Sequence, residues 1–188
     1  INGSQIKGDI ISSFDEKTWI NLDNGTFNFA DKITYDGTTF QIKLSDGTDV
    51  EDWMKEYENS KEALESELED VKDRMDDLDT ILDDSFTDGI ITEVERNRIE
   101  DSLRQLNREK QDIDQRYDVI YNDVNLIGTS KTNLATTYSN FNTKYNNLIS
   151  VIGRIIADDK ATDTEKSSYN TALDDYNATI PPLTTAFD

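Results

Sequence analysis

The stretch Asp83–Glu95, DDSFTDGIITEVE, joins two long segments of helical periodicity and decides how they are connected. If Gly89 is the sixth position of a calcium-binding loop, the stretch supplies oxygen atoms at several positions that such loops use. The residues concerned, at positions one, five, nine and twelve, are Asp84, Asp88, Thr92 and Glu95. Position three is Phe86, whose side chain has no oxygen, and this departure counts against a metal site.

An elbow between two helices accounts for the same stretch. Asp88-Gly89 is typical of a tight turn, because glycine adopts the positive φ angle that many turns require. Thr92 followed by Glu95 has the spacing of a capping box, in which each side chain accepts a hydrogen bond from the backbone amide of the other residue. The same Thr-x-x-Glu pattern recurs at Thr162. The sequence therefore predicts a helical hairpin here rather than a calcium site.

Before the elbow, apolar residues recur at alternating steps of four and three. This first seam comprises Val50, Met54, Tyr57, Lys61, Leu64, Leu68, Val71, Met75, Leu78 and Leu82. A heptad pattern sustained over this length predicts a coiled coil. Lys61 costs stability in such a seam but can fix register or strand number. The positions outside the seam are rich in Asp and Glu, as expected for a solvated helix face.

Further seams follow the elbow. The second comprises Ile99, Leu103, Leu106, Lys110, Ile113, Tyr117, Ile120 and Val124, and its outside carries several arginines. Similar length, a short link and partly complementary charge predict that the first two segments form an antiparallel hairpin. After a break at Ile127–Ser130, the third seam comprises Leu134, Tyr138, Phe141, Tyr145, Leu148, Ile152 and Ile155. A shorter fourth segment carries Tyr169 and Tyr176, and we expect Pro181-Pro182 to stop it.

Residues 1–48 have the pattern of short β-strands joined by tight turns. Asn24-Gly25, Asp36-Gly37 and Asp46-Gly47 recur about every ten residues, and apolar residues alternate between them. TWINLDNGTFNF and ITYDGTTFQIKL are each typical of a β-hairpin. Hairpins of this size bury too little apolar surface to be stable alone, so we expect them to need partners, most simply other copies of the chain.

Composition excludes several functions. The chain has 188 residues, no His and no Cys, which removes the commonest general base, thiol nucleophiles, structural zinc sites and disulfides. Its formal charge of −21 repels nucleic acid and anionic lipid. No segment predicts a membrane span or a signal peptide. Because the sequence begins at Ile1 rather than Met, we expect it to be part of a longer protein.

The sequence contains no recognisable set of catalytic residues. Paired carboxylates could act as acid and base in sugar hydrolysis, but 40 acidic residues produce such pairs by chance. No glycine-rich phosphate loop is present. The aromatic residues of the third seam could form a sugar-binding stripe, although aromatic residues at this spacing are more often core. We predict no catalytic, cofactor-binding or metal-ligating residue and no cofactor, and hence a protein that is not an enzyme.

The N-terminal region resembles modules in the tail proteins of phages and prophages of Gram-positive bacteria. The resemblance rests on an Ile-x-Gly element, a Thr-Trp-x-x-Leu-x-x-Gly-Thr-Phe element and a Tyr-x-Gly element. In this chain they are Ile6 to Gly8, Thr18, Trp19, Leu22, Gly25, Thr26, Phe27, Tyr35 and Gly37. The helical part, with DGIITEVE and YNDVNLIGTSKTNL, is similar to segments that follow such modules. The resemblance implies a tail-fibre or tail-tip protein, usually trimeric, that positions host-binding or wall-degrading parts.

These observations predict a mostly helical α+β fold with three regions. They are a β-hairpin trimerisation region over 1–48, a long helical hairpin or coiled coil over 49–127, and a C-terminal helical segment over 128–188. We expect an elongated structural protein of the virion, assembled in the bacterial cytoplasm as a homotrimeric spacer for host adhesion. Its expected partners are other tail proteins, with cell-wall glycan as an alternative partner, and we expect neither nucleic-acid binding nor membrane insertion.

The residues expected to hold the copies together lie in the first seam and in the β region. They are Leu64, Leu68, Val71, Met75 and Leu78, with Trp19, Phe27 and Phe40. Two alternatives remain. The chain could bind cell-wall glycan directly, or it could be a non-catalytic segment of a tail-associated lytic enzyme. The seams could also pair within one chain, as a three- or four-helix bundle.

Overall fold

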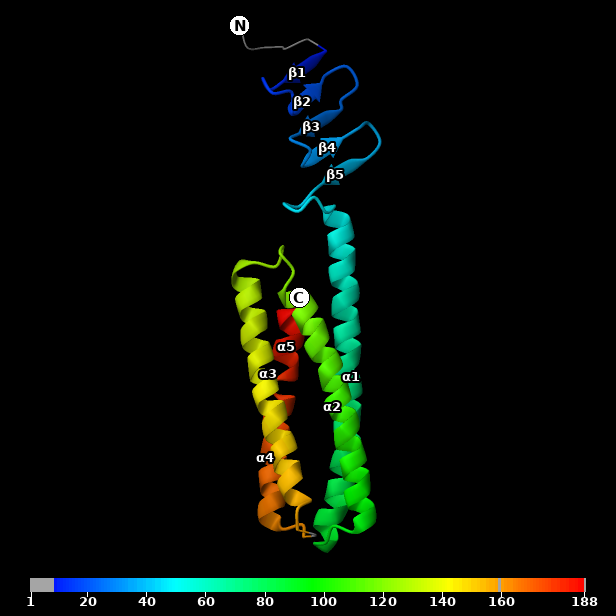
Figure 1. Cartoon of the computed structure of the whole chain (residues 1–188), viewed down its shortest axis with the longest axis vertical. Helices are drawn as coiled ribbons and strands as arrows, with labels where there is room; N and C mark the ends of the chain where they lie inside the picture. Colours follow the sequence, from blue (N-terminus) through cyan, green and yellow to red (C-terminus); the bar gives the residue numbers. More distant parts are fainter. Residues whose placement is uncertain (1–8, 159, 188) are drawn as a thin grey trace. The chain divides into compact units, whose positions relative to one another are not determined.

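The computed structural model describes residues 9–158 and 160–187, which form an α+β structure that is mostly helical (Figure 1). The chain divides into two compact units, residues 1–59 and 60–188. The first contains an antiparallel sheet and the second contains packed helices. The two units are described separately below.

The sheet is a meander in which each strand pairs with the next one along the chain. Its strands are β1 (Ile10–Ser12), β2 (Thr18–Asn21), β3 (Phe27–Phe29), β4 (Ile33–Tyr35) and β5 (Phe40–Ile42). Both hairpins expected from the sequence are confirmed, with Ile20 opposite Phe27 and Tyr35 opposite Phe40. The turn before β5 needs the positive φ of Gly37, at 98°, and Asp36 accepts hydrogen bonds there from two backbone amides.

Five helices follow the sheet. They are α1 (Val50–Asp88), α2 (Glu93–Tyr121), α3 (Gly128–Ile155), α4 (Asp163–Asn177) and α5 (Ile180–Ala186). The first helix begins in the sheet-bearing unit and continues into the second unit. None of the helices in the described ranges is long and apolar enough to cross a membrane.

Two details of the helices differ from the sequence expectation. The first helix continues to Asp88, so the elbow is only Gly89–Thr92 and most of the DDSFTDGIITEVE stretch is helical. Pro181 and Pro182 do not stop the fourth helix, which already ends at Asn177. They lie instead in the first turn of α5, where a missing backbone N–H costs nothing because those amides have no partner within the helix.

The antiparallel hairpin of α1 and α2 is confirmed. Arg74 of α1 pairs with Glu109 of α2, and Glu67, earlier in α1, pairs with Arg116, later in α2. This reversed order is the one that antiparallel helices require. Charge complementarity between the two segments, expected from the sequence, therefore takes the form of two ion pairs across the hairpin.

The helical unit buries its seams within one chain. In the first seam, residues from Leu64 to Leu82 are at most 3% exposed, and they pack among the chain's own helices. The core continues through the other helices with Ile99, Leu106, Ile113, Leu134, Phe141, Leu148, Ile152, Tyr169, Tyr176 and Leu183. Of the two pairings left open by the sequence, the described chain thus makes the one within a single chain, and no exposed apolar seam remains from Leu64 onward.

The helical unit is an internal duplication. A shift of 70 residues along the sequence aligns Thr92 with Thr162. The same shift aligns the buried positions of α1 and α2 with those of α3, α4 and α5. Equivalent buried pairs are Leu64 and Leu134, Leu68 and Tyr138, Val71 and Phe141, Met75 and Tyr145, Leu78 and Leu148, Ile99 and Tyr169, Leu106 and Tyr176, and Ile113 and Leu183. The sequence shows only a faint echo of this repeat, because the repeated positions hold different apolar residues.

The two elbows meet at one end of the helical unit (Figure 1). Ile90 and Lys160 form an antiparallel β-bridge, and the amide of Ala161 donates to the carbonyl of Gly89 at 3.2 Å. The bridge joins two equivalent residues, because the shift of 70 residues aligns Ile90 with Lys160. Such a self-equivalent contact is expected where two similar halves are related by a twofold axis.

Candidate interaction surfaces

The sheet has one apolar face and one polar face. Residues directly opposite each other in the strand register share a face, and faces alternate along each strand. The register therefore assigns the following side chains to the apolar face: Ile11, Thr18, Ile20, Phe27, Phe29, Ile33, Tyr35, Phe40 and Ile42. The other face is mostly polar and carries Ile10, Ser12, Trp19, Asn21, Asn28, Thr34 and Gln41.

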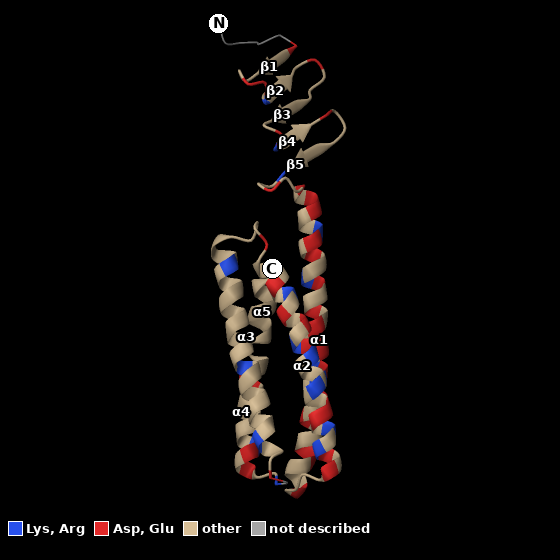
Figure 2. Ribbon diagram, in the orientation of Figure 1, with Lys and Arg blue, Asp and Glu red and all other residues tan. Residues whose placement is uncertain are grey.

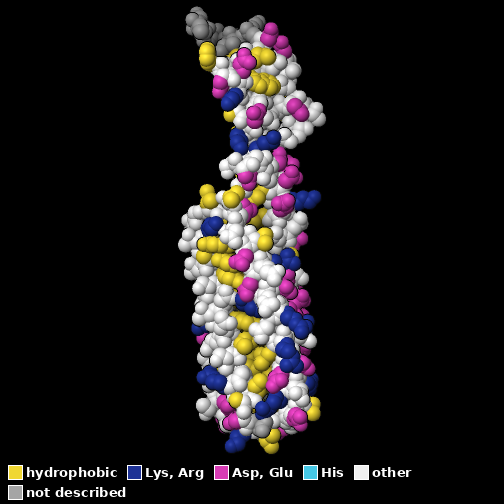
Figure 3. Space-filling view, viewed as in Figure 1, with side chains coloured by type: hydrophobic (Ala, Val, Ile, Leu, Met, Phe, Trp, Pro, Cys, Tyr) yellow, Lys and Arg dark blue, Asp and Glu magenta, His cyan; other side chains and the backbone are white. Residues whose placement is uncertain are grey.

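Aromatic rings cluster at the middle of the apolar face. The Phe27 ring centroid lies 5.4 Å from that of Phe29, 6.0 Å from Tyr35 and 6.2 Å from Phe40. The cluster is still open to solvent, since Phe40 is 53% exposed and Phe29 is 39% exposed. Figure 3 shows hydrophobic side chains uncovered on the surface of the sheet.

The sheet-bearing unit has no core of its own among its described residues. Between residues 9 and 59, the only side chain that is buried belongs to Thr26, and every apolar side chain there keeps part of its surface in solvent. Thr26 itself is held by Asn24, which accepts from its amide at 3.0 Å and from its hydroxyl at 2.7 Å. A one-layer sheet thus presents its apolar face without a second layer.

The residues expected to hold copies together are distributed differently from the expectation. Phe27 and Phe40 do share the apolar face, but Trp19 lies on the opposite, polar face. The helical residues Leu64 and Leu78 are fully buried among the chain's own helices. The sequence pattern placed these residues correctly at apolar positions. It did not show which face of the sheet each strand residue lies on. It also did not distinguish packing inside one bundle from a contact between chains.

The helical unit holds a buried charge at Lys110. Its side chain is 10% exposed and pairs with Asp114, one turn later on α2. The Lys110 ammonium also lies 5.4 to 5.8 Å from the ring centroids of Tyr138, Phe141 and Tyr145 on α3. Cation–π attraction and one carboxylate together compensate the buried charge. In the sequence, this contact is indicated by Lys110 in the otherwise apolar second seam and by the aromatic residues of the third seam.

The tyrosines of α3 and α4 are buried phenols. Burial raises the pKa of Tyr138, and its hydroxyl donates to Asp114, which raises the pKa further. Burial also raises the pKa of Tyr145 and Tyr176. The hydroxyls of these two residues are buried without a hydrogen-bond partner among the described residues. Because a raised phenol pKa disfavours the anion, these groups are suited to packing and not to proton transfer near neutral pH.

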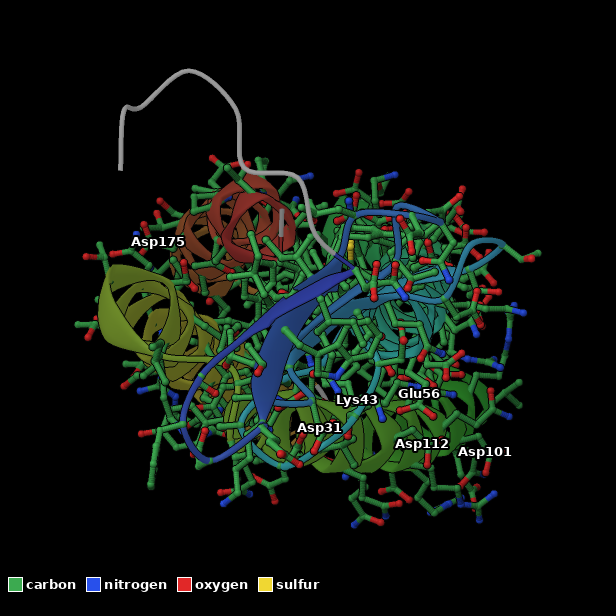
Figure 4. The ribbon with its side chains drawn as sticks, turned by 90° about the horizontal axis from the view of Figure 1, so that it is seen from above. Asp31, Lys43, Glu56, Asp101, Asp112 and Asp175 are labelled. Atoms are coloured by element: carbon green, nitrogen blue, oxygen red, sulfur yellow. The ribbon has the colours of Figure 1, made fainter. Side chains whose placement is uncertain are left out.

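A groove of about 940 Å³ follows the outer side of α3, and Tyr121 of α2 and Lys131 contribute to its wall. The rest of the lining consists of Gly128, Thr132, Ala135, Thr136, Ser139, Asn140 and Thr143. Figure 2 shows that α3 carries few charges, whereas α1 and α2 carry many. Viewed along the helices, Asp101 and Asp112 of α2 extend outward (Figure 4). This groove is rich in hydroxyl groups and has no acidic residue in its lining, which is unusual on this acidic chain.

The elbow is built as a helix cap. The Thr92 hydroxyl accepts from the Glu95 amide at 3.2 Å, and the Glu95 carboxylate accepts from the Thr92 amide at 2.8 Å. The same two bonds form between Thr162 and Glu165. The two capping boxes are thus confirmed. Across residues 9–158 and 160–187, no group of three or more acidic side chains is arranged to hold a metal ion.

Comparison with known proteins does not assign the chain to a family. No family model, no curated protein and no solved structure matches it. The interaction surfaces above therefore have to be interpreted from their own chemistry.

Proposed function

We propose that this chain is a structural and adhesion-related component of a phage or prophage tail, in which it forms a homotrimeric spacer that positions host-contacting modules. The observation that carries the proposal is the uncovered apolar face of the N-terminal sheet. Four of the residues on which the resemblance to tail modules rests lie in the strands of this sheet, namely Thr18, Trp19, Phe27 and Tyr35, whereas Ile6 to Gly8 lie outside the described residues. The surface proposed for assembly and the residues that carry the resemblance thus lie in the same part of the chain, the N-terminal sheet.

The helical unit suits the spacer role. At 1.5 Å per residue, the 39 residues of α1 extend roughly 60 Å. The helices that pack on it form a continuous core in each chain, and such a core resists bending and compression. In this proposal the sheet joins the copies and the helical unit separates the attached modules. Its partners are neighbouring tail proteins, and its place is the assembled virion.

Light scattering of the purified chain tests the trimer. The expected mass is three times the 21.5 kDa of one chain. A clean monomer at micromolar concentration contradicts the homotrimer. The tail role is tested separately by immunogold electron microscopy of phage particles induced from the bacterial strain that carries the gene. Gold at the tail supports the role, and particles whose tails stay unlabelled contradict it.

Direct binding of cell-wall glycan is a second candidate, and the groove along α3 favours it. Hydroxyl and amide groups such as Ser139 and Asn140 match the donors and acceptors of a neutral sugar. Binding of the chain to purified cell walls tests this function. Asn140→Ala should weaken binding, whereas Asn170→Ala, at an exposed position of α4 outside the groove, should not. Equal binding by both variants and the unaltered chain argues against a site in the groove.

A further inference from the structure

We propose that the sheet-bearing unit has no core until copies of the chain meet, and that its apolar face then packs against the same face of the other copies. The helical unit, by contrast, completes its core within each chain. This inference deepens the proposed homotrimeric spacer and rests on it for the number of copies. It locates the assembly contact in the strands rather than in the helical seams.

The first argument is that the sheet needs a second layer. A β-sheet with strands of three or four residues gains stability by burying one face. Here that face is assembled but uncovered, and among residues 9–59 no apolar side chain is buried. The polar face, with Asn28, Thr34 and Gln41, suits contact with water. Despite Ile10 and Trp19 on the polar face, most apolar side chains of the strands share the other face, and an antiparallel sheet with this pattern commonly buries that face alone.

The second argument concerns the chemistry of the occupant. The apolar face carries no ionised side chain, whereas the whole chain has a formal charge of −21. Two copies that approach through most other surfaces bring acids together, and like charges repel. Two copies that meet through the sheet bring Phe27 and Phe40 against their equivalents. A second copy is therefore an occupant that this chemistry accepts.

The third argument is the size of the face. On this face Ile11, Phe29, Ile33, Phe40 and Ile42 are 38–53% exposed. With the smaller contributions of its half-buried members, the apolar face offers on the order of 600 Å² per copy, compared with ~800 Å² per partner in a standard stable interface. The face therefore approaches, without reaching, the size that a standard specific complex requires.

The fourth argument is that the helical unit has no matching surface to offer. Its large apolar side chains are buried among its own helices, and those that are exposed, such as Val94, Val119 and Ile127, come from different places in α2 and the following loop. A second sheet has an apolar face of matching size and pattern. Apolar faces that converge on a threefold axis bury one another and give a closed cyclic trimer, and closed symmetry is the usual form of homo-oligomers.

Adjacent residues of β5 provide a matched test. Phe40 points to the apolar face and Gln41 to the polar face, and both are exposed in the single chain. Phe40→Asp places a charge in the proposed interface of every copy and should raise the dissociation constant roughly 100-fold or more. Gln41→Asp adds the same charge on the outside and should leave the mass unchanged. Phe40→Leu keeps the face apolar and should also assemble.

Light scattering over a concentration series, combined with far-UV circular dichroism, reads out the result. We expect Phe40→Asp to be a monomer that retains the helical signal, because the helical unit completes its core in one chain. If Phe40→Asp keeps the mass of the unaltered trimer, this inference is overturned while the trimeric spacer stands. A dimer that Phe40→Asp dissociates supports the sheet interface and contradicts the trimer. A monomeric unaltered chain overturns both.

Discussion

Lys110 shows how one residue can be buried with its charge intact. Its ammonium is enclosed by three aromatic rings of α3 and by Asp114, which also accepts the hydroxyl of Tyr138. Asp114 itself is partly exposed, so water also solvates its carboxylate. The carboxylate therefore satisfies two partners at once and fixes α2 against α3.

Asp114→Ala should lower the free energy of unfolding by about 2 kcal/mol, because the buried ammonium then lacks its counter-ion. Urea unfolding measures the change. Asp118→Ala, at an exposed position one turn away, is the matched control and should change stability by less than about 0.5 kcal/mol. The double variant Lys110→Met and Asp114→Ala should recover much of the loss, since it removes both charges. An additive double variant would contradict the assigned pairing.

Buried phenols should make the helical unit sensitive to alkali. Burial raises the pKa values of Tyr145 and Tyr176 in the folded state above the ordinary 10.0. The unfolded chain therefore releases these protons first, so their stabilisation is complete below about pH 10 and is lost as the pH rises through the folded pKa values. The urea midpoint of unfolding, measured at several pH values between about 8 and 11, should fall above about pH 10. Tyr176→Phe should make this fall smaller. Equal slopes for the two proteins would refute the role of this phenol.

At the scale of elements, the two elbows are equivalent parts of a duplicated hairpin. Each begins its second helix with the same reciprocal Thr–Glu cap, at Thr92 and Thr162. The bridge between Ile90 and Lys160 then holds the elbows together. Because both caps make the same hydrogen bonds, their contributions to stability should be alike.

Thr92→Ala and Thr162→Ala should each lower the free energy of unfolding by about 1 kcal/mol, the usual cost of losing a helix N-cap. Chemical denaturation of the two variants checks this. Thr87→Ala is a suitable control, because Thr87 is exposed near the end of α1 and its hydroxyl bonds only to the preceding turn. A loss at one elbow without a comparable loss at the other would show that the two caps are not equivalent.

The elements were largely predictable from the sequence, because their signals are local. The seams of Val50–Leu82 and the Thr92 cap depend on spacing within one helix, and the Asn-Gly and Asp-Gly turns depend on a few neighbouring residues. What covers each apolar side chain was not predictable. A heptad seam has the same pattern whether Leu64 packs within one chain or between chains, and Trp19 fits a strand equally well on either face.

At the scale of the molecule, the two units differ in where their stability comes from. The helical unit has a continuous core from Leu64 to Leu183, whereas the described part of the sheet-bearing unit has none. Folding that depends on association varies with protein concentration, and folding within a chain does not. Under the proposed assembly, the two units should therefore respond differently to dilution.

Dilution of the purified chain by about 100-fold should lower the thermal midpoint of the sheet and leave that of the helices unchanged. The far-UV helical signal follows the second transition. Tryptophan fluorescence follows the first, because both tryptophans, Trp19 and Trp53, belong to the sheet-bearing unit. The Gln41→Asp variant serves as the control that should keep the concentration dependence. A midpoint of the sheet that is independent of concentration would contradict assembly through its apolar face.

The duplication of the helical hairpin has a consequence for how the two halves remain together. Only the short connection from Asn122 to Ile127 joins α2 to α3, so the hairpins are tethered at an effective concentration of the order of millimolar. At such a local concentration their pairing tolerates imperfect matching. The outer surfaces of the halves can then differ, with many acidic residues along α1 and none along α3, while the shared core keeps its spacing.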